Sequence, residues 1–100
     1  MLWAIIRTAS PANAAGRAKH HEAHADYLRS QKKILVLSGP TLTDDGNGVT
    51  GSLLVVNVGS RAEAQAFVDA DPYQKVGMFT EVKITRMRKG QWNAAAMEGA

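Results

Sequence analysis

The chain has 100 residues, of which 45% are hydrophobic and 21% are charged, and it carries a formal net charge of +3 without any cysteine. That length fits one domain, the plentiful Val, Ile and Leu exclude a disordered chain, and the lack of cysteine excludes disulfides and thiolate metal sites. No segment reaches the roughly 18 apolar residues of a membrane span, so we expect a cytoplasmic protein without a membrane partner.

The first two predicted elements are a strand and a long helix. Leu2–Arg7 is short, apolar and rich in β-branched residues, which favours a strand. Ser10 and Pro11 end this strand and are typical of a helical start, with Ser10 as the cap. The helix should settle by about Gly16 and end near residues 31–33. Its apolar stripe has residues spaced by three or four positions: Ala14, Ala18, His21, Ala25 and Leu28.

Two more strands follow the helix. Ile34–Leu37 is predicted to be the second strand, ended by the turn-forming residues Ser38–Pro40. Ser52–Val58 is predicted to be the third. The stretch Pro40–Gly51 between them contains strong turn residues but is longer than a tight turn needs, and long loops are often functional.

The next segment predicts two helices separated by a proline. Ser60 and Glu63 match a capping box, in which the serine caps a free N–H group and the glutamate reaches back to the N–H of Ser60. This helix should continue to Ala70. Because Pro72 disfavours helical geometry at the residue before it, Asp71 is predicted to cap a second, short helix.

Phe79–Met87 alternates apolar and polar residues and is predicted to be the fourth strand. A basic cluster at its end lacks the interleaved aromatic residues of a nucleic-acid surface, so we expect a solvated strand and no nucleic-acid partner. The cluster consists of Lys83, Arg86, Arg88 and Lys89. Residues 1–90 are therefore assigned to the domain and residues 91–100, with Trp92, to a C-terminal tail.

This order of elements predicts a ferredoxin-like α+β fold, βαββαβ, with a four-stranded antiparallel sheet and two helices on one face. A sheet with one wet face alternates apolar and polar residues. Trp3–Ile6, Ile34–Leu37 and Leu53–Val56 are instead apolar on both faces. We therefore expect a homodimer through the open sheet face; the alternative is a monomer with an unusually apolar open face.

Three histidines lie within five positions of the first helix. His20 and His24 have the spacing of metal ligands, but Glu22 points away from them, so no metal site is predicted. His21 lies on the apolar stripe and is expected to be packed. His24 lies beside the stripe, where a side chain can be half-buried and still reach a ligand, although a plain surface histidine is the alternative.

Asp71 also has two interpretations. It can act simply as a helix cap. A carboxylate held by backbone N–H groups also stays ionised and fixed, and facing a histidine it would orient the ring and favour the imidazolium.

Several short motifs together resemble the YciI-like (YCII-related domain) family, over nearly the whole chain from Leu2 to about Lys89. The most specific is DADPY at 69–73. The motif positions are Arg17, His24, Tyr27-Leu28, Ser38-Gly39-Pro40, Thr50-Gly51-Ser52-Leu53 and Asp69-Ala70-Asp71-Pro72-Tyr73. The resemblance implies a dimeric α+β barrel with an active-site pair at His24 and Asp71. One branch of the family removes chloride from a chlorinated hydroxyhydroquinone. Thr41, after the Gly-Pro pair, departs from the family's usual apolar residue.

On this basis the hypothesis is a cofactor-independent enzyme that uses His24 and Asp71 for acid–base chemistry, such as isomerisation or elimination, on a small organic acid, lactone or phenol. Gly39, Pro40 and Ser52 would shape the pocket, and Arg17 could neutralise an acidic substrate. The alternative is a non-catalytic small-ligand-binding or accessory protein with the same cleft.

Overall fold

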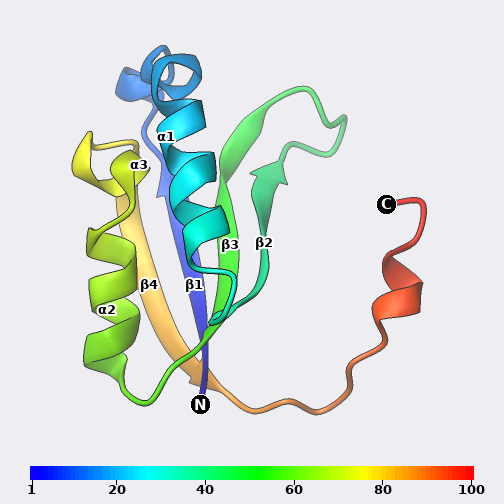
Figure 1. Ribbon diagram of the computed structural model, residues 1–100. Coiled ribbons are helices and arrows are strands. Elements are labelled where there is room, and N and C mark those ends of the chain that lie inside the picture. The colour runs from blue at the N-terminus through cyan, green and yellow to red at the C-terminus, as the bar shows by residue number, and fades with distance from the viewer.

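The computed structural model describes residues 1–100 and has one antiparallel sheet with strands in the order β2-β3-β1-β4 (Figure 1). The strands are β1 (Leu2–Ala9), β2 (Leu35–Leu42), β3 (Val49–Asn57) and β4 (Phe79–Met87). The helices are α1 (Gly16–Ser30), α2 (Arg61–Asp69) and α3 (Pro72–Lys75), with 3₁₀ turns at Pro11–Asn13 and Ala94–Met97. This is the predicted ferredoxin-like fold.

The core lies between the sheet and α2. Successive side chains of a strand point to opposite faces, and β1 sends Trp3, Ile5 and Arg7 towards the helices, where all three are buried. Leu54 and Val56 of β3 join this layer. The helix side comes from Ala64, Phe67 and Val68 of α2. A buried arginine therefore continues the apolar row of β1.

Helix α1 buries none of its residues. It is attached through half-buried Tyr27 and Leu28, and the Tyr27 hydroxyl donates to the carbonyl of Phe67 at 2.7 Å. Of the predicted apolar stripe, Leu28 packs against the core, whereas His21 is exposed rather than packed. The physical reason is that α1 stands over a cavity, so its inward side meets open space.

The hairpin between β2 and β3 is the largest departure from the predicted boundaries. Strand β2 continues through Ser38–Pro40 to Leu42, and β3 begins at Val49, which leaves only residues 43–48 for the loop. The predicted long loop is wrong. Because β2 is an edge strand, the N–H group that Pro40 lacks is tolerated there.

The helix caps agree largely with the sequence. The Ser60 side chain accepts from the Glu63 N–H at 3.1 Å, but Glu63 accepts from the N–H of Gly59 rather than of Ser60. Asp71 caps α3 by accepting from the Tyr73 N–H. Ser10 makes no side-chain cap bond.

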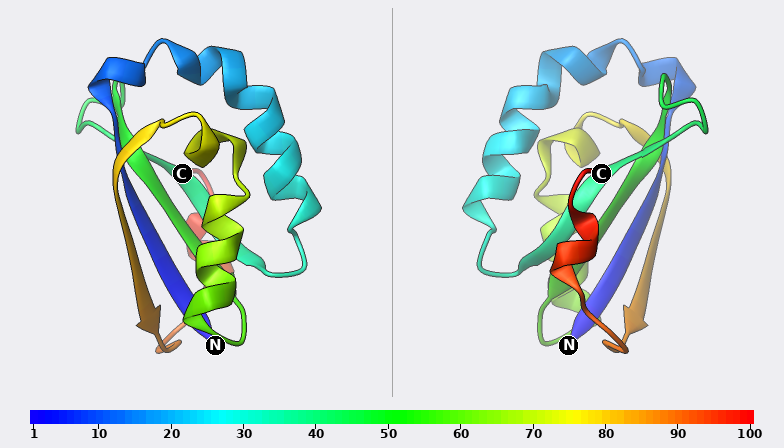
Figure 2. Two further views of the ribbon diagram at one scale, coloured as in Figure 1. Left: turned by 90° about the vertical axis from the view of Figure 1, so that its left-hand side faces the viewer. Right: turned by 90° about the vertical axis from the view of Figure 1, so that its right-hand side faces the viewer.

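The second face of the sheet carries no helix, as the edge-on views show (Figure 2). Ala4, Leu53 and Val55 are half-buried on it, and Ile6 is 44% exposed. The C-terminal tail runs away from β4 past the β2 edge (Figure 1). None of the helices combines the length and apolar character that a membrane crossing requires.

Candidate active site

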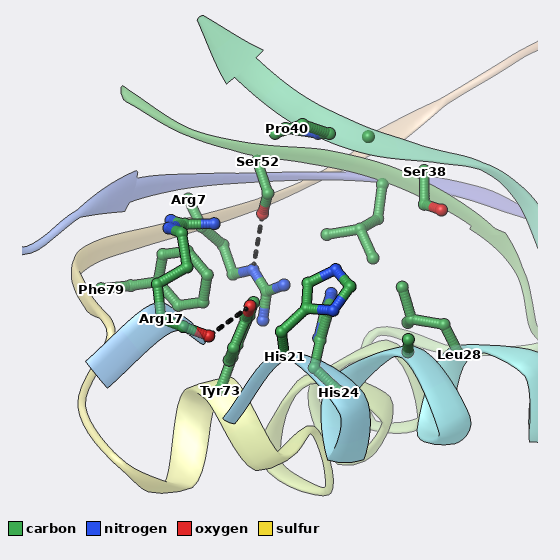
Figure 3. Close-up of a pocket in the computed structure, with 13 residues that line it drawn as sticks. Arg7, Arg17, His21, His24, Leu28, Ser38, Pro40, Ser52, Tyr73 and Phe79 are labelled. Atoms are coloured by element: carbon green, nitrogen blue, oxygen red, sulfur yellow. Dashed lines mark hydrogen bonds between the residues drawn. The ribbon is translucent and has the colours of Figure 1, made fainter. Parts of the chain in front are cut away.

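A cavity of about 270 Å³ opens between α1 and the sheet (Figure 3). Helix α1 forms one wall with Arg17, His21 and His24, and the strands form the other. Ser52 of β3 and Pro40 of β2 lie on the strand side. The extension of β2 beyond its predicted end thus supplies part of the cavity wall.

His24 and Asp71 meet behind this wall. The Nδ1 atom of His24 lies 2.8 Å from the Oδ1 atom of Asp71. The His24 side chain is 15% exposed and that of Asp71 is 1% exposed. With a carboxylate accepting at Nδ1, the neutral ring carries its proton there and keeps the Nε2 lone pair free. The arrangement matches a base with an orienting carboxylate.

Asp71 has three hydrogen-bond donors around it. Besides His24, the Tyr73 N–H donates to Oδ1 at 3.0 Å, and Nη1 of Arg7 donates to Oδ2 at 2.8 Å. Burial alone would raise the pKa of this carboxyl, but the hydrogen bonds and charges of His24 and Arg7 outweigh burial and hold the pKa below its usual value. Asp71 is therefore ionised at neutral pH.

Arg7 is the buried cation of the site, with a side chain 1% exposed. It donates from Nε to the Ser52 hydroxyl at 2.9 Å, and its guanidinium lies 4.0 Å from the centre of the Phe79 ring. Burial lowers the pKa of Arg7, Asp71 raises it, and the neighbouring Arg17 lowers it. The remaining nitrogen, Nη2, is buried and makes no hydrogen bond to the protein.

Tyr73 fixes the second side of the histidine. Its ring stacks on that of His24 with centroids 4.0 Å apart and planes 10° from parallel. Its hydroxyl donates to the carbonyl of Arg17 at 3.1 Å (Figure 3). Burial raises the pKa of Tyr73, so the phenol is neutral. A hydrogen bond and a stacked ring thus restrict the imidazole to one orientation.

The residues selected from the sequence come together at this one place. Arg17, Gly39, Pro40 and Ser52 line the cavity with His24, and Asp71 lies behind the histidine. Gly39 presents only backbone, and Ser52 is engaged with Arg7. His20 does not line the cavity, whereas His21 does.

A model of the YCII-related domain family matches residues 1–88. The chain belongs to this family. Protein YciI of Escherichia coli O6:H1 is 32% identical over 74 residues, which is 69% of this chain and 74% of that protein, and Protein YciI of Shigella flexneri matches equally.

A solved structure of another protein shares the fold closely. The 5-chloro-2-hydroxyhydroquinone dehydrochlorinase (TftG) from Burkholderia phenoliruptrix AC1100, in complex with 2,5-dihydroxybenzoquinone, is 33% identical with a TM-score of 0.81. The match covers 90% of this chain and 96% of that one. The ferredoxin-like YCII architecture is therefore confirmed.

Sequence reasoning missed Arg7 and Phe79 as site residues. A partial signal for Arg7 was present, because a residue in register with Trp3 and Ile5 shares their face of the sheet, although the strand does not show which face is inward. Phe79 stood at the start of a correctly predicted strand, but nothing in its local sequence indicated that its ring would meet a guanidinium.

Proposed function

We propose that this YCII-family protein is a cofactor-independent enzyme that moves a proton on a small organic acid, lactone or phenol. The observation that carries this proposal is the 2.8 Å contact between His24 Nδ1 and the buried carboxylate of Asp71, at the wall of a cavity. The likeness to a dehydrochlorinase that acts on a hydroquinone supports a small-molecule substrate.

In the proposed reaction His24 acts as the general base. Its Nε2 takes a proton from carbon or from a hydroxyl group of the substrate, and Asp71 stabilises the imidazolium that forms. The proton then returns at another atom, which gives isomerisation, or a leaving group departs with its electron pair, which gives elimination. Arg7 keeps Asp71 ionised throughout.

Turnover by matched histidine variants tests this proposal. A panel of small phenols, lactones and acids, including 5-chloro-2-hydroxyhydroquinone, would be incubated with the purified protein and product formation followed. On any compound turned over, His24→Gln should lose about 10²- to 10⁴-fold in kcat, the usual contribution of a general base.

The matched control is His20→Gln, one turn away on the same helix and outside the cavity, which should retain the activity. Equal rates for His24→Gln and the unsubstituted chain would contradict the proposal. Binding without any turnover across the panel would favour the alternative, a ligand-binding protein.

We also propose a homodimer formed through the open face of the sheet. Ile6, Leu53 and Val55 place apolar side chains on that face, where no helix covers them. Pairing two copies around a two-fold axis would bury both faces at once. Both sites of such a dimer would lie on the outer, helix-covered sides.

A further inference from the structure

The cavity has an excess of positive charge. Arg7 and Arg17 both line it, whereas no carboxylate does. The one carboxylate nearby, Asp71, is buried and already hydrogen-bonded to Arg7, to His24 and to a backbone N–H. One of the two guanidinium charges therefore has no counter-ion at the site.

Each of the two arginines lies over one ring of a contacting aromatic pair. The Arg7 guanidinium lies 4.0 Å from the Phe79 ring centre, and that of Arg17 lies 5.4 Å from the Tyr73 ring centre. The two rings meet edge to face at 6.4 Å. Burial is the main cause that lowers the pKa of Arg7, and the like charge of Arg17 adds to this lowering. A negative charge placed near both would relieve this repulsion.

Arg7 supplies a second, independent sign of a missing partner. Its Nη2 atom is buried without a hydrogen bond, although Nε and Nη1 are both engaged. An unpaired donor on a buried charged group is costly. In Figure 3 the guanidinium extends from Ser52 towards the imidazole rings of His21 and His24, which border the cavity.

We infer that the site takes its ligand as an anion, with a carboxylate or phenolate oxygen bound by the Arg7 and Arg17 guanidinium groups. This inference rests on the proposed function and narrows its substrate class, since it excludes neutral lactones and neutral phenols as the bound form. The cavity of about 270 Å³ lies just below the usual range for drug-sized ligands, so a single substituted ring fits better than a larger molecule.

The test compares anions with neutral molecules of nearly the same shape. Benzoate is paired with benzamide, and 4-nitrophenolate with 4-nitroanisole, and each is titrated into the full chain by calorimetry. We expect at least one anion to bind about tenfold or more tightly than its neutral partner, the effect of a charge-assisted hydrogen bond. The two pairs distinguish a carboxylate ligand from a phenolate. Equal or undetectable binding within both pairs would overturn the inference.

Arginine variants assign the effect to the site. Arg17→Gln should lose about tenfold in affinity for the anion and leave the neutral compound unchanged, because it removes a positive charge that lines the cavity. Arg29→Gln is the matched control, since Arg29 lies on the same helix, exposed and paired with Asp26. Unchanged anion affinity in Arg17→Gln, or an equal loss in Arg29→Gln, would contradict the inference.

Arg7→Lys keeps the positive charge but has fewer hydrogen-bond donors. Its anion affinity is compared with that of the unsubstituted chain only if the circular dichroism spectra and melting temperatures of the two proteins match. The Arg17 result stands without it. The binding assay also separates this inference from the proposed function. If the protein binds anions but turns over no compound, the anion inference stands and the proposed enzymatic function is contradicted. If it turns over a neutral lactone and shows no preference for anions, the enzymatic function stands and the anion inference is contradicted.

Discussion

Asp71 combines two tasks in one side chain. It caps α3 through the Tyr73 N–H and holds His24 and Arg7 through its two oxygens. Asp71 can therefore be a helix cap and a candidate site residue at the same time. The carboxylate that begins α3 also fixes the imidazole, so the position of the short helix sets that of the histidine.

Asp71 should give the stability of the protein an acid dependence. Its pKa in the folded chain lies below the ordinary 3.8, because His24 and Arg7 outweigh the opposing effect of burial. A depressed folded-state pKa stabilises the fold above the unfolded value and loses this contribution as the pH falls through the folded value. We expect the urea concentration at the midpoint of unfolding to decrease as the pH is lowered below about 4. This decrease should be smaller in Asp71→Asn.

The matched control is Asp69→Asn, an exposed carboxylate at the end of α2. It should keep the acid dependence of the unsubstituted chain. If Asp71→Asn retained the full dependence, the acid sensitivity would have to come from another group.

The meeting of His24 with Asp71 could not be worked out from the residues alone. They lie 47 positions apart, and only the family resemblance paired them. Arg7 was missed because β1 is apolar on both faces, so its alternation is weak evidence of which face is inward. His21 was wrongly predicted to be packed. Helical periodicity identifies the inward face of a helix, but it does not show whether protein or a cavity lies beneath that face.

At the scale of elements, β1 and β3 approach each other closely at the pair Thr8–Gly51, next to the pair formed by Arg7 and Ser52. Gly51 of β3 pairs with Thr8, and a Cβ atom there would lie 1.9 Å from the carbonyl oxygen of Arg7. The paired strands cannot separate without breaking their ladder. We expect Gly51→Ala to lower the free energy of unfolding by about 2 kcal/mol or more, measured by urea denaturation.

Gly39→Ala is the matched control, because a Cβ atom at Gly39 on the neighbouring edge strand meets nothing within 4 Å. Similar stabilities for the two variants would show that the strands can adjust. This contrast also distinguishes two glycines that belong to two different family motifs. Gly51 is required by close packing, whereas Gly39 is not.

The strand and helix types followed from local sequence, and their ends did so less well. Phe79–Met87 was predicted to the residue because it alternates clearly, and the proline after Asp71 placed α3. The β2 boundary was wrong because Gly39 and Pro40 are turn formers, and their tolerance in a strand depends on β2 being at the edge of the sheet. Strand order is a property of the whole fold, which local signals do not contain.

At the scale of the whole molecule, the uncovered sheet face predicts association. Ile6, 44% exposed at the middle of β1, should lie within the interface of the proposed dimer. We expect light scattering to give twice the chain's 10.7 kDa mass. Ile6→Asp should shift the protein towards the monomer, because a charge would be buried without a partner.

Val76→Asp places the same charge at an equally exposed apolar residue, 40% exposed at the end of α3 on the other side of the molecule. It should leave the mass unchanged. A monomer for the unsubstituted chain, or an Ile6→Asp variant that stays dimeric, would rule out this interface.

Helix α1 buries none of its own residues, although it forms a wall of the cavity. Much of its anchorage therefore comes from a few contacts, among them those of Tyr27 with Phe67 and of His24 with Asp71. A molecule that fills the cavity would give this wall the packing partner it lacks. Ligand occupancy and the thermal tolerance of the fold are thus linked by mass action, and the protein would be hardest to unfold when its site is full.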